Sequence, residues 1–132
     1  MIRGRLCIIA ENVVRDAETN NISVINIIEE LHAQGFPLFA PKVVFFVLWE
    51  RELTDPPIYH SEVIVTINEQ RLHTGPVEID FREGRRHRSI ITILGLVIPQ
   101  PGQLTFSLRV QDGIEATCTI PIIAPQSVIR SE

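Results

Sequence analysis

The chain has 132 residues, a length that fits a single domain with a core of its own. Hydrophobic residues make up 45% of it and charged residues 21%, a composition that excludes wholesale disorder. The formal net charge of −4 argues against a general nucleic-acid-binding protein, because such proteins are usually basic.

β-branched residues dominate the composition: 20 Ile and 12 Val together make up 32 of the 132 residues. Their stiff side chains suit a pleated, half-buried surface better than a helix. Turn residues recur about every ten positions, which is typical of all-β domains. The sequence therefore predicts one mostly antiparallel β-sandwich of immunoglobulin-like type with about eight strands. These are expected at about residues 5–15, 22–31, 42–50, 58–68, 71–81, 87–96, 103–110 and 114–122.

The first expected strand contains an apolar stretch at residues 6–10, which Glu11 and Asn12 interrupt. This stretch is too short for the core of a signal peptide and far too short to cross a membrane. We therefore expect a cytoplasmic protein without a membrane partner. In that compartment Cys7 and Cys118 are expected to be reduced thiols.

The turn after the first strand places Asp16, Glu18 and Asn20 at alternate positions, as in the first half of a calcium loop. However, the sixth position is Asn21 instead of glycine and the twelfth is Ile27 instead of glutamate. A hairpin turn rich in Asx residues explains the pattern better. Further along, the sequence allows at most a single turn of helix, around residues 29–34.

The third expected strand carries seven consecutive apolar residues, so both of its faces are expected to be covered. Side chains alternate along a strand, which divides these residues into two stripes. The inward stripe, assigned to the core, is Val43, Phe45, Val47 and Trp49. The outward stripe is Val44, Phe46 and Leu48. The outward assignment rests on Lys42 and Glu50, charged residues that bracket this stripe and prefer water.

The outward stripe needs a cover, since burying each of its side chains stabilises by roughly 1.5–3 kcal/mol. One candidate is the loop at residues 33–41, whose Phe36, Leu38 and Phe39 could fold back over the strand. The other candidate is a second subunit or a partner protein. The stripe is therefore a candidate protein interface.

Four arginines surround a glycine turn between the fifth and sixth expected strands: Arg82, Arg85, Arg86 and Arg88. Guanidinium groups bind phosphate and carboxylate in a bidentate manner, so these residues are a candidate anion-binding site. The alternative is a solvated hairpin that keeps a sheet edge from pairing with other chains. No aromatic residues interleave with the arginines to stack on bases, which favours the alternative.

The register of the last hairpin follows from alternation, because directly paired residues share a face. The apolar faces of the two strands meet only if the loop has three residues, 111–113, with Gly113 at positive φ. Val110 is then expected opposite Ile114, and Phe106 opposite Cys118. The domain is expected to span residues 1–124, followed by a short tail at 125–132.

The order of these features resembles a small family of uncharacterised bacterial proteins that are predicted to be immunoglobulin-like β-sandwiches. The resemblance covers residues 6–122, with Asn20-Asn21 where a glycine is expected in the first hairpin. It implies a fold and no activity, so it assigns no catalytic residue. The residues that carry it are Asp16, Thr19, Ile22-Ser23, Ile25-Asn26-Ile27, Phe36-Pro37, Pro76-Val77-Glu78-Ile79, Arg88, Gly95-Leu96, Pro99 and Pro101-Gly102.

Signatures of catalysis or of cofactor binding are missing from the sequence. It contains no Gly-x-Ser-x-Gly elbow, no P-loop and no Cys-x-x-Cys pair. The four histidines, His32, His60, His73 and His87, have no metal-ligand spacing, although they could converge in space. We expect no catalytic residue, metal or cofactor.

The sequence therefore favours a non-enzymatic interaction module that binds a protein partner or itself, in part by analogy with the fold. The second hypothesis is binding of an anionic ligand or nucleic acid through the arginine-rich turn at residues 82–88. A third, less favoured hypothesis is a hydrolase whose histidines and acids converge in space.

Overall fold

The computed structural model describes residues 1–125, which form nine strands and no helix. The predicted tail therefore lies, apart from Pro125, outside the described residues. The strands are β1 (Arg3–Arg15), β2 (Ile22–Ile27), β3 (Leu31–His32), β4 (Leu38–Glu50), β5 (Ile58–Ile67), β6 (Gln70–Asp80), β7 (Arg86–Ile98), β8 (Gly102–Val110) and β9 (Glu115–Ile123).

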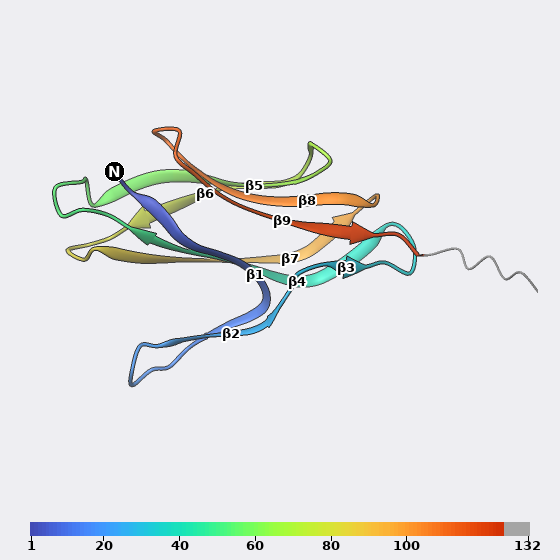
Figure 1. Cartoon of the computed structure of the whole chain (residues 1–132), viewed down its shortest axis with the longest axis horizontal. Helices are drawn as coiled ribbons and strands as arrows, with labels where there is room; N and C mark the ends of the chain where they lie inside the picture. The colour runs from blue at the N-terminus through green and yellow to red at the C-terminus, as the bar shows by residue number, and fades with distance from the viewer. Residues whose placement is uncertain (126–132) are drawn as a thin grey trace, which may run out of the picture.

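The strands form two sheets, which Figure 1 shows as two layers. Sheet A has four strands in the order β2-β1-β4-β7, and sheet B has five in the order β3-β9-β8-β5-β6. Every pairing is antiparallel except that of β3 with β9. The prediction of an all-β, mostly antiparallel chain is confirmed.

Each of the eight expected strands has a counterpart, and β3 is the additional one. It lies within residues 29–34, where the sequence allowed at most a single helical turn, and no helix forms there. Leu31 pairs with Ile122 of β9, and its side chain packs against the core. Asn26, the penultimate residue of the second strand, has a φ of 55°, a left-handed conformation that is uncommon in strands, and the strand ends one residue later at Ile27.

The core lies between the two sheets and draws apolar side chains from both. The ring centroids of Phe45 on β4 and Phe106 on β8 are 5.6 Å apart, so the layers contact each other directly. All four residues of the inward stripe are buried, which confirms their assignment to the core. Burying each such side chain stabilises the fold by roughly 1.5–3 kcal/mol.

The last hairpin has the predicted register. Phe106 pairs with Cys118, and the backbone N–H of Val110 donates to the carbonyl oxygen of Ile114 at 2.7 Å. Gly113 has a φ of 82°, the left-handed conformation that the three-residue loop requires. Alternation and the length of the loop together therefore predict this part of the fold.

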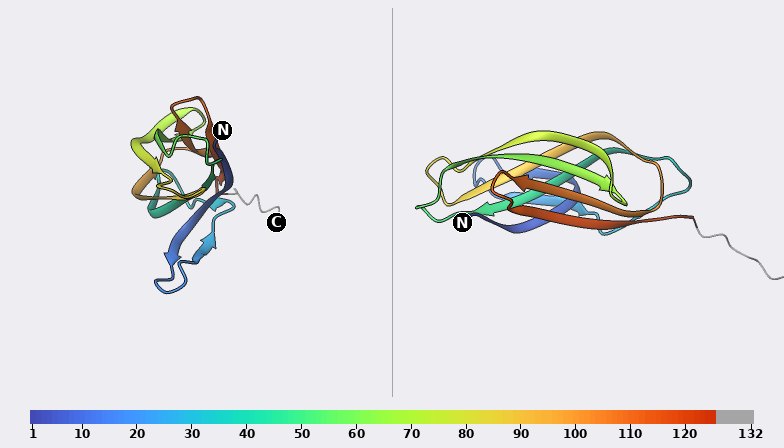
Figure 2. Two further views of the ribbon diagram at one scale, coloured as in Figure 1. Left: turned by 90° about the vertical axis from the view of Figure 1, so that its left-hand side faces the viewer. Right: turned by 90° about the horizontal axis from the view of Figure 1, so that it is seen from above.

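Strand β1 pairs with two different strands along its length. Its first part pairs with β4 as far as Ala10, and its second part pairs with β2 as far as Arg15. Between the two parts it curves. The β1–β2 hairpin therefore lies below β4 and β7 in Figure 1 and projects from the two layers in the left view of Figure 2. This curvature creates the site described below.

The tip of the β1–β2 hairpin is the Asx-rich turn expected from the sequence. The Asp16 carboxylate accepts hydrogen bonds from the backbone N–H groups of Glu18 at 2.8 Å and Thr19 at 3.1 Å. These donors, Thr19 first, hold the pKa of Asp16 below its ordinary value. The carboxylate thus stabilises the turn.

Residues 1–125 contain no helix that is both long enough and apolar enough to cross a membrane.

Candidate binding surfaces of sheet A

The outward stripe of β4 is covered within the chain itself. Val44 and Phe46 are 2% and 3% exposed, and Leu48 is half-buried. Ile22 and Val24 of the β1–β2 hairpin lie over the stripe and border, together with Phe46 and Leu48, a hollow of about 260 Å³. This hairpin is a cover that sequence reasoning did not consider.

The loop at residues 33–41, which the sequence favours as the cover, does not lie over the outward stripe. Its Phe36 and Leu38 pack against the core between the sheets, whereas Phe39 is exposed. A partner protein is not needed to bury Val44 and Phe46 either. The candidate interface at this stripe is therefore reduced to the partly exposed Leu48 and the rim of the hollow.

The structure separates the four candidate arginines into two pairs. Arg82 and Arg85 lie in the turn between β6 and β7 and are exposed. Arg86 and Arg88 lie at the start of β7, opposite Glu50 and Leu48 of β4, and both border the hollow. Two sets of residues that the sequence treated separately, the outward stripe and the arginines, thus meet at one site.

The arginine-rich turn is held by Arg51, a buried residue that sequence reasoning missed. Arg51 is 6% exposed. Its Nε donates to the carbonyl oxygen of Gly84 at 2.8 Å, and its Nη1 donates to that of Asp55, also at 2.8 Å. Its guanidinium carbon lies 5.5 Å from the centroid of the Phe81 ring. Arg51 therefore fixes the turn at residues 82–85 and the loop after β4 relative to each other.

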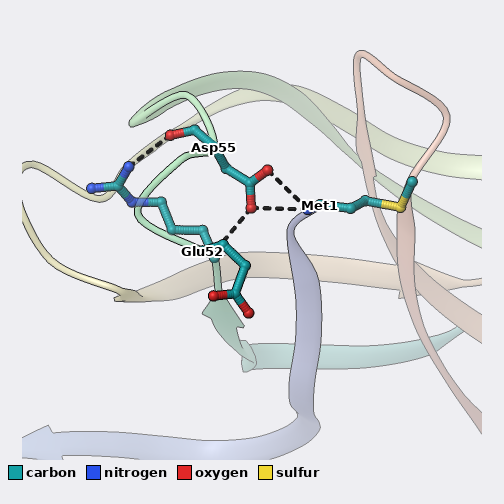
Figure 3. A network of polar contacts seen from close by, with 4 residues as sticks. Met1, Glu52 and Asp55 are labelled. Atoms are coloured by element: carbon teal, nitrogen blue, oxygen red, sulfur yellow. Dashed lines mark hydrogen bonds and ion pairs between the residues drawn. The ribbon is translucent and has the colours of Figure 1, made fainter.

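Asp55 connects the same loop to the start of β1 (Figure 3). Its carboxylate accepts from the amino group of Met1 at 2.8 and 2.9 Å and from the backbone N–H of Glu52 at 2.9 Å. These bonds, that of the amino group first, hold the pKa of Asp55 below its ordinary value. The network fixes the loop geometry beside the arginines.

Glu50 is surrounded by arginines at the rim of the hollow. Its carboxylate accepts a hydrogen bond from Arg3 at 3.0 Å, while Arg86 lies at 3.6 Å in a longer ion pair. The hydrogen bond from Arg3 lowers the pKa of Glu50, and the nearby charges of Arg5, Arg3 and Arg86 lower it further. A single carboxylate thus faces several guanidinium groups, which leaves this region positively charged.

Sheet A also carries most of the exposed apolar surface. Of the eleven large hydrophobic residues exposed in the described part of the chain, eight lie on its strands. The largest exposures among them are those of Leu94 on β7, at 73%, and Phe39 on β4, at 60%. The eight are Leu6, Val14, Ile25, Ile27, Phe39, Ile90, Leu94 and Val97.

Strand β7 combines exposed apolar side chains with an unpaired edge. It is the terminal strand of sheet A, and β4 is its single strand partner among the described residues. Residues 89–98 contain no charged residue and no proline. Proteins usually protect such an edge with charges, prolines or bulges. Apart from a local irregularity at Gly95, whose φ is 70°, residues 89–98 have none of these, so this strand is suited to pairing with another chain.

Cys7 and Cys118 are free, half-buried thiols in the first and last strands. Burial, and after it the neighbouring Cys118, raises the pKa of Cys7 to about 12. Burial also raises the pKa of Cys118. Because the thiolate is the reactive form, neither residue has the properties of a catalytic nucleophile.

Alkylation by iodoacetamide is therefore expected to be slow in the folded protein. A pKa of about 12 instead of 9.0 makes the Cys7 thiolate about a thousand times scarcer at neutral pH. We expect Cys7 to be labelled at least about a hundredfold faster in urea than in native buffer, and Cys118 also to be labelled faster in urea, measured by mass spectrometry. Equal labelling rates in the two conditions would show that the thiols are not packed as described.

The histidines do not converge. His32, His60 and His73 are exposed, whereas His87 is half-buried, with its ring centroid 6.0 Å from that of Phe81. Burial lowers the pKa of His87. Within residues 1–125 no three His, Cys, Asp or Glu side chains are placed to share a metal ion. The described residues therefore supply no geometry for metal-assisted hydrolysis.

Together these features define a two-layered all-β protein with an exposed apolar sheet edge and an arginine-bordered hollow. The chain belongs to a family of unknown function, DUF6941, whose model matches residues 5–123. The predicted membership of an uncharacterised family is thus confirmed. The curated proteins contain no match to the chain.

Proposed function

We propose that this protein is a non-enzymatic interaction module that binds a protein strand along the free edge of β7. The strand comes from a partner protein or from a second copy of the chain. The concentration of eight of the eleven exposed large hydrophobic residues on sheet A supports this proposal most strongly. Large exposed apolar patches typically mark interaction sites.

Strand addition explains both features of β7. An incoming strand would satisfy the backbone groups along its edge, while pockets for alternate side chains would supply specificity. Leu94 and Val97, exposed on β7 itself, and Phe39, opposite Val97 on β4, would be covered by the partner. The arginines at the start of the strand would limit pairing at that end, because Arg86 and Arg88 are charged.

The proposal also concerns the fold class of the protein and its location in the cell. The two packed sheets would be an immunoglobulin-like sandwich, a class that commonly presents binding surfaces at its strands and loops. The protein would act in the cytoplasm of a bacterium, where Cys7 and Cys118 stay reduced. Their free state in the structure fits a reducing compartment.

A matched pair of substitutions tests the proposed edge. Leu94→Lys places a charge on β7, and Ile58→Lys places the same charge on sheet B at a residue that is 48% exposed. Both variants are expected to stay folded, because surface substitutions usually change the free energy of unfolding by no more than about 0.5 kcal/mol. Only Leu94→Lys is expected to lose association, since the charge would have to be buried against the partner.

Association is measured by sedimentation over a range of protein concentrations and by affinity capture from the native host with all three proteins. The proposal predicts self-association, or one captured protein, that persists with Ile58→Lys and disappears with Leu94→Lys. The proposal is contradicted if the wild-type protein stays monomeric and captures no host protein that Leu94→Lys does not also capture.

A further inference from the structure

The hollow between the β1–β2 hairpin and sheet A has an apolar interior and a charged rim. Its apolar lining comes from the hairpin and from the outward face of the sheet: Leu6, Ile22, Val24, Phe46 and Leu48. Arg86 and Arg88 complete the lining. Its volume of about 260 Å³ lies just below the range of about 300–1,000 Å³ that is typical of sites for drug-sized ligands. It therefore suits a smaller molecule.

The two arginines at the rim retain hydrogen-bonding capacity. Nη1 of Arg88 donates to the backbone carbonyl oxygen of Asn20 at 2.7 Å, with a longer contact of 3.4 Å to the side-chain oxygen of the same residue. These are the hydrogen bonds of Arg88 within the described residues, and a guanidinium group has five N–H donors. Arg86 has the ion pair with Glu50 at 3.6 Å, in which its side chain stays 72% exposed.

Local charge favours an anion although the whole chain is acidic. Glu50 is the carboxylate nearest to Arg86, and its shorter bond, at 3.0 Å, is to Arg3. Asp16, at the hairpin tip, uses its carboxylate for the backbone N–H groups of its own turn. Arg86 and Arg88 therefore present more positive charge at the rim than the neighbouring acids neutralise.

We propose that this hollow binds a small aliphatic carboxylate, with the alkyl chain between the hairpin and sheet A and the carboxylate on Arg86 and Arg88. The apolar lining excludes a purely polar anion as the preferred ligand, and the arginines disfavour an uncharged alkyl chain. Guanidinium and carboxylate groups form strong, charge-assisted hydrogen bonds. This site is separate from the β7 edge used by the proposed protein partner.

Binding of octanoate to the intact protein tests the proposal, with octanol and acetate as controls for the charge and for the chain. Methyl resonances in NMR report the position, since Ile22, Val24 and Leu48 border the hollow whereas Leu94 and Val97 lie on β7. We expect saturable shifts confined to the first group. Octanol and acetate are expected to bind at least about tenfold more weakly than octanoate.

Three arginine variants identify the charged contact. Arg86→Gln and Arg88→Gln are each expected to weaken octanoate binding at least about tenfold, whereas Arg85→Gln, in the exposed turn, leaves it unchanged. Arg88→Gln also removes the bond to Asn20, so Arg86→Gln is the decisive variant if the hairpin detaches. The proposal is overturned if octanoate does not bind, if octanol binds equally well, or if Arg86→Gln and Arg85→Gln behave alike. None of these outcomes bears on the Leu94→Lys experiment.

Discussion

Replacing Phe46 with alanine is expected to lower the free energy of unfolding by about 3–5 kcal/mol, as for other buried phenylalanines. Phe46 lies on the outer face of sheet A, yet it is almost fully buried because the β1–β2 hairpin covers it. Its removal leaves a cavity between hairpin and sheet and loses apolar burial. Urea denaturation followed by tryptophan fluorescence measures the effect.

Ile90→Ala is the matched control for this prediction. Ile90 lies directly opposite Phe46 on β7 and is exposed, so its truncation is expected to cost less than about 1 kcal/mol. Similar small losses for both variants would mean that the hairpin does not cover Phe46 in solution. In that case the outward stripe would again be a candidate interface.

Replacing Arg51 with methionine is expected to lower the free energy of unfolding by about 1.5–3 kcal/mol, the contribution that is usual for hydrogen bonds from a charged group. Methionine keeps much of the aliphatic bulk but donates no hydrogen bonds. The carbonyl groups of Gly84 and Asp55, which lie in partly exposed loops, would lose charged donors and would have to bind water instead. Thermal and urea denaturation measure the loss.

The control for Arg51 lies in the same region. Arg85→Met changes an exposed arginine in the turn that Arg51 holds, and its effect is expected to stay within about 0.5 kcal/mol. If Arg51→Met were as mild as Arg85→Met, the loop after β4 and the arginine-rich turn would not depend on this guanidinium group.

Strand positions and register could be predicted because they depend on local patterns. The alternation of apolar residues in β8 and β9 excludes a two-residue loop, and Gly113 suits a three-residue one. The inward stripe of β4 follows from the same argument. Each of these inferences needs only the period of a strand and the conformational preferences of a few turn residues.

The cover of Phe46 could not be predicted, because it depends on how far β1 curves between its two partners. Alternation shows which side chains share a face but not which distant segment lies over that face. The curvature brings Ile22 close to Phe46 across more than twenty positions in sequence. The sequence instead favours the loop at residues 33–41, because its three apolar side chains could fold back over the strand.

Arg51 and the β7 edge were missed for related reasons. Arg51 follows Glu50 at the end of a strand, where a charged residue is usually solvated, and its acceptors are backbone carbonyls that leave no sequence signal. Residues 89–98 resemble a buried central strand in composition, since they contain no charge. Only the strand order shows that, within residues 1–125, β7 has a free edge.

The proposed binding along β7 is tested most directly by amide hydrogen exchange, with β6, the terminal strand of sheet B, as the internal reference. Exchange is compared between low and high protein concentration, and between the free protein and the complex obtained by affinity capture. The account predicts that amides of residues 89–98 exchange more slowly in at least one associated state, while those of β6 are unchanged. Unchanged exchange on β7 in every condition, or equal slowing on β6, would contradict it.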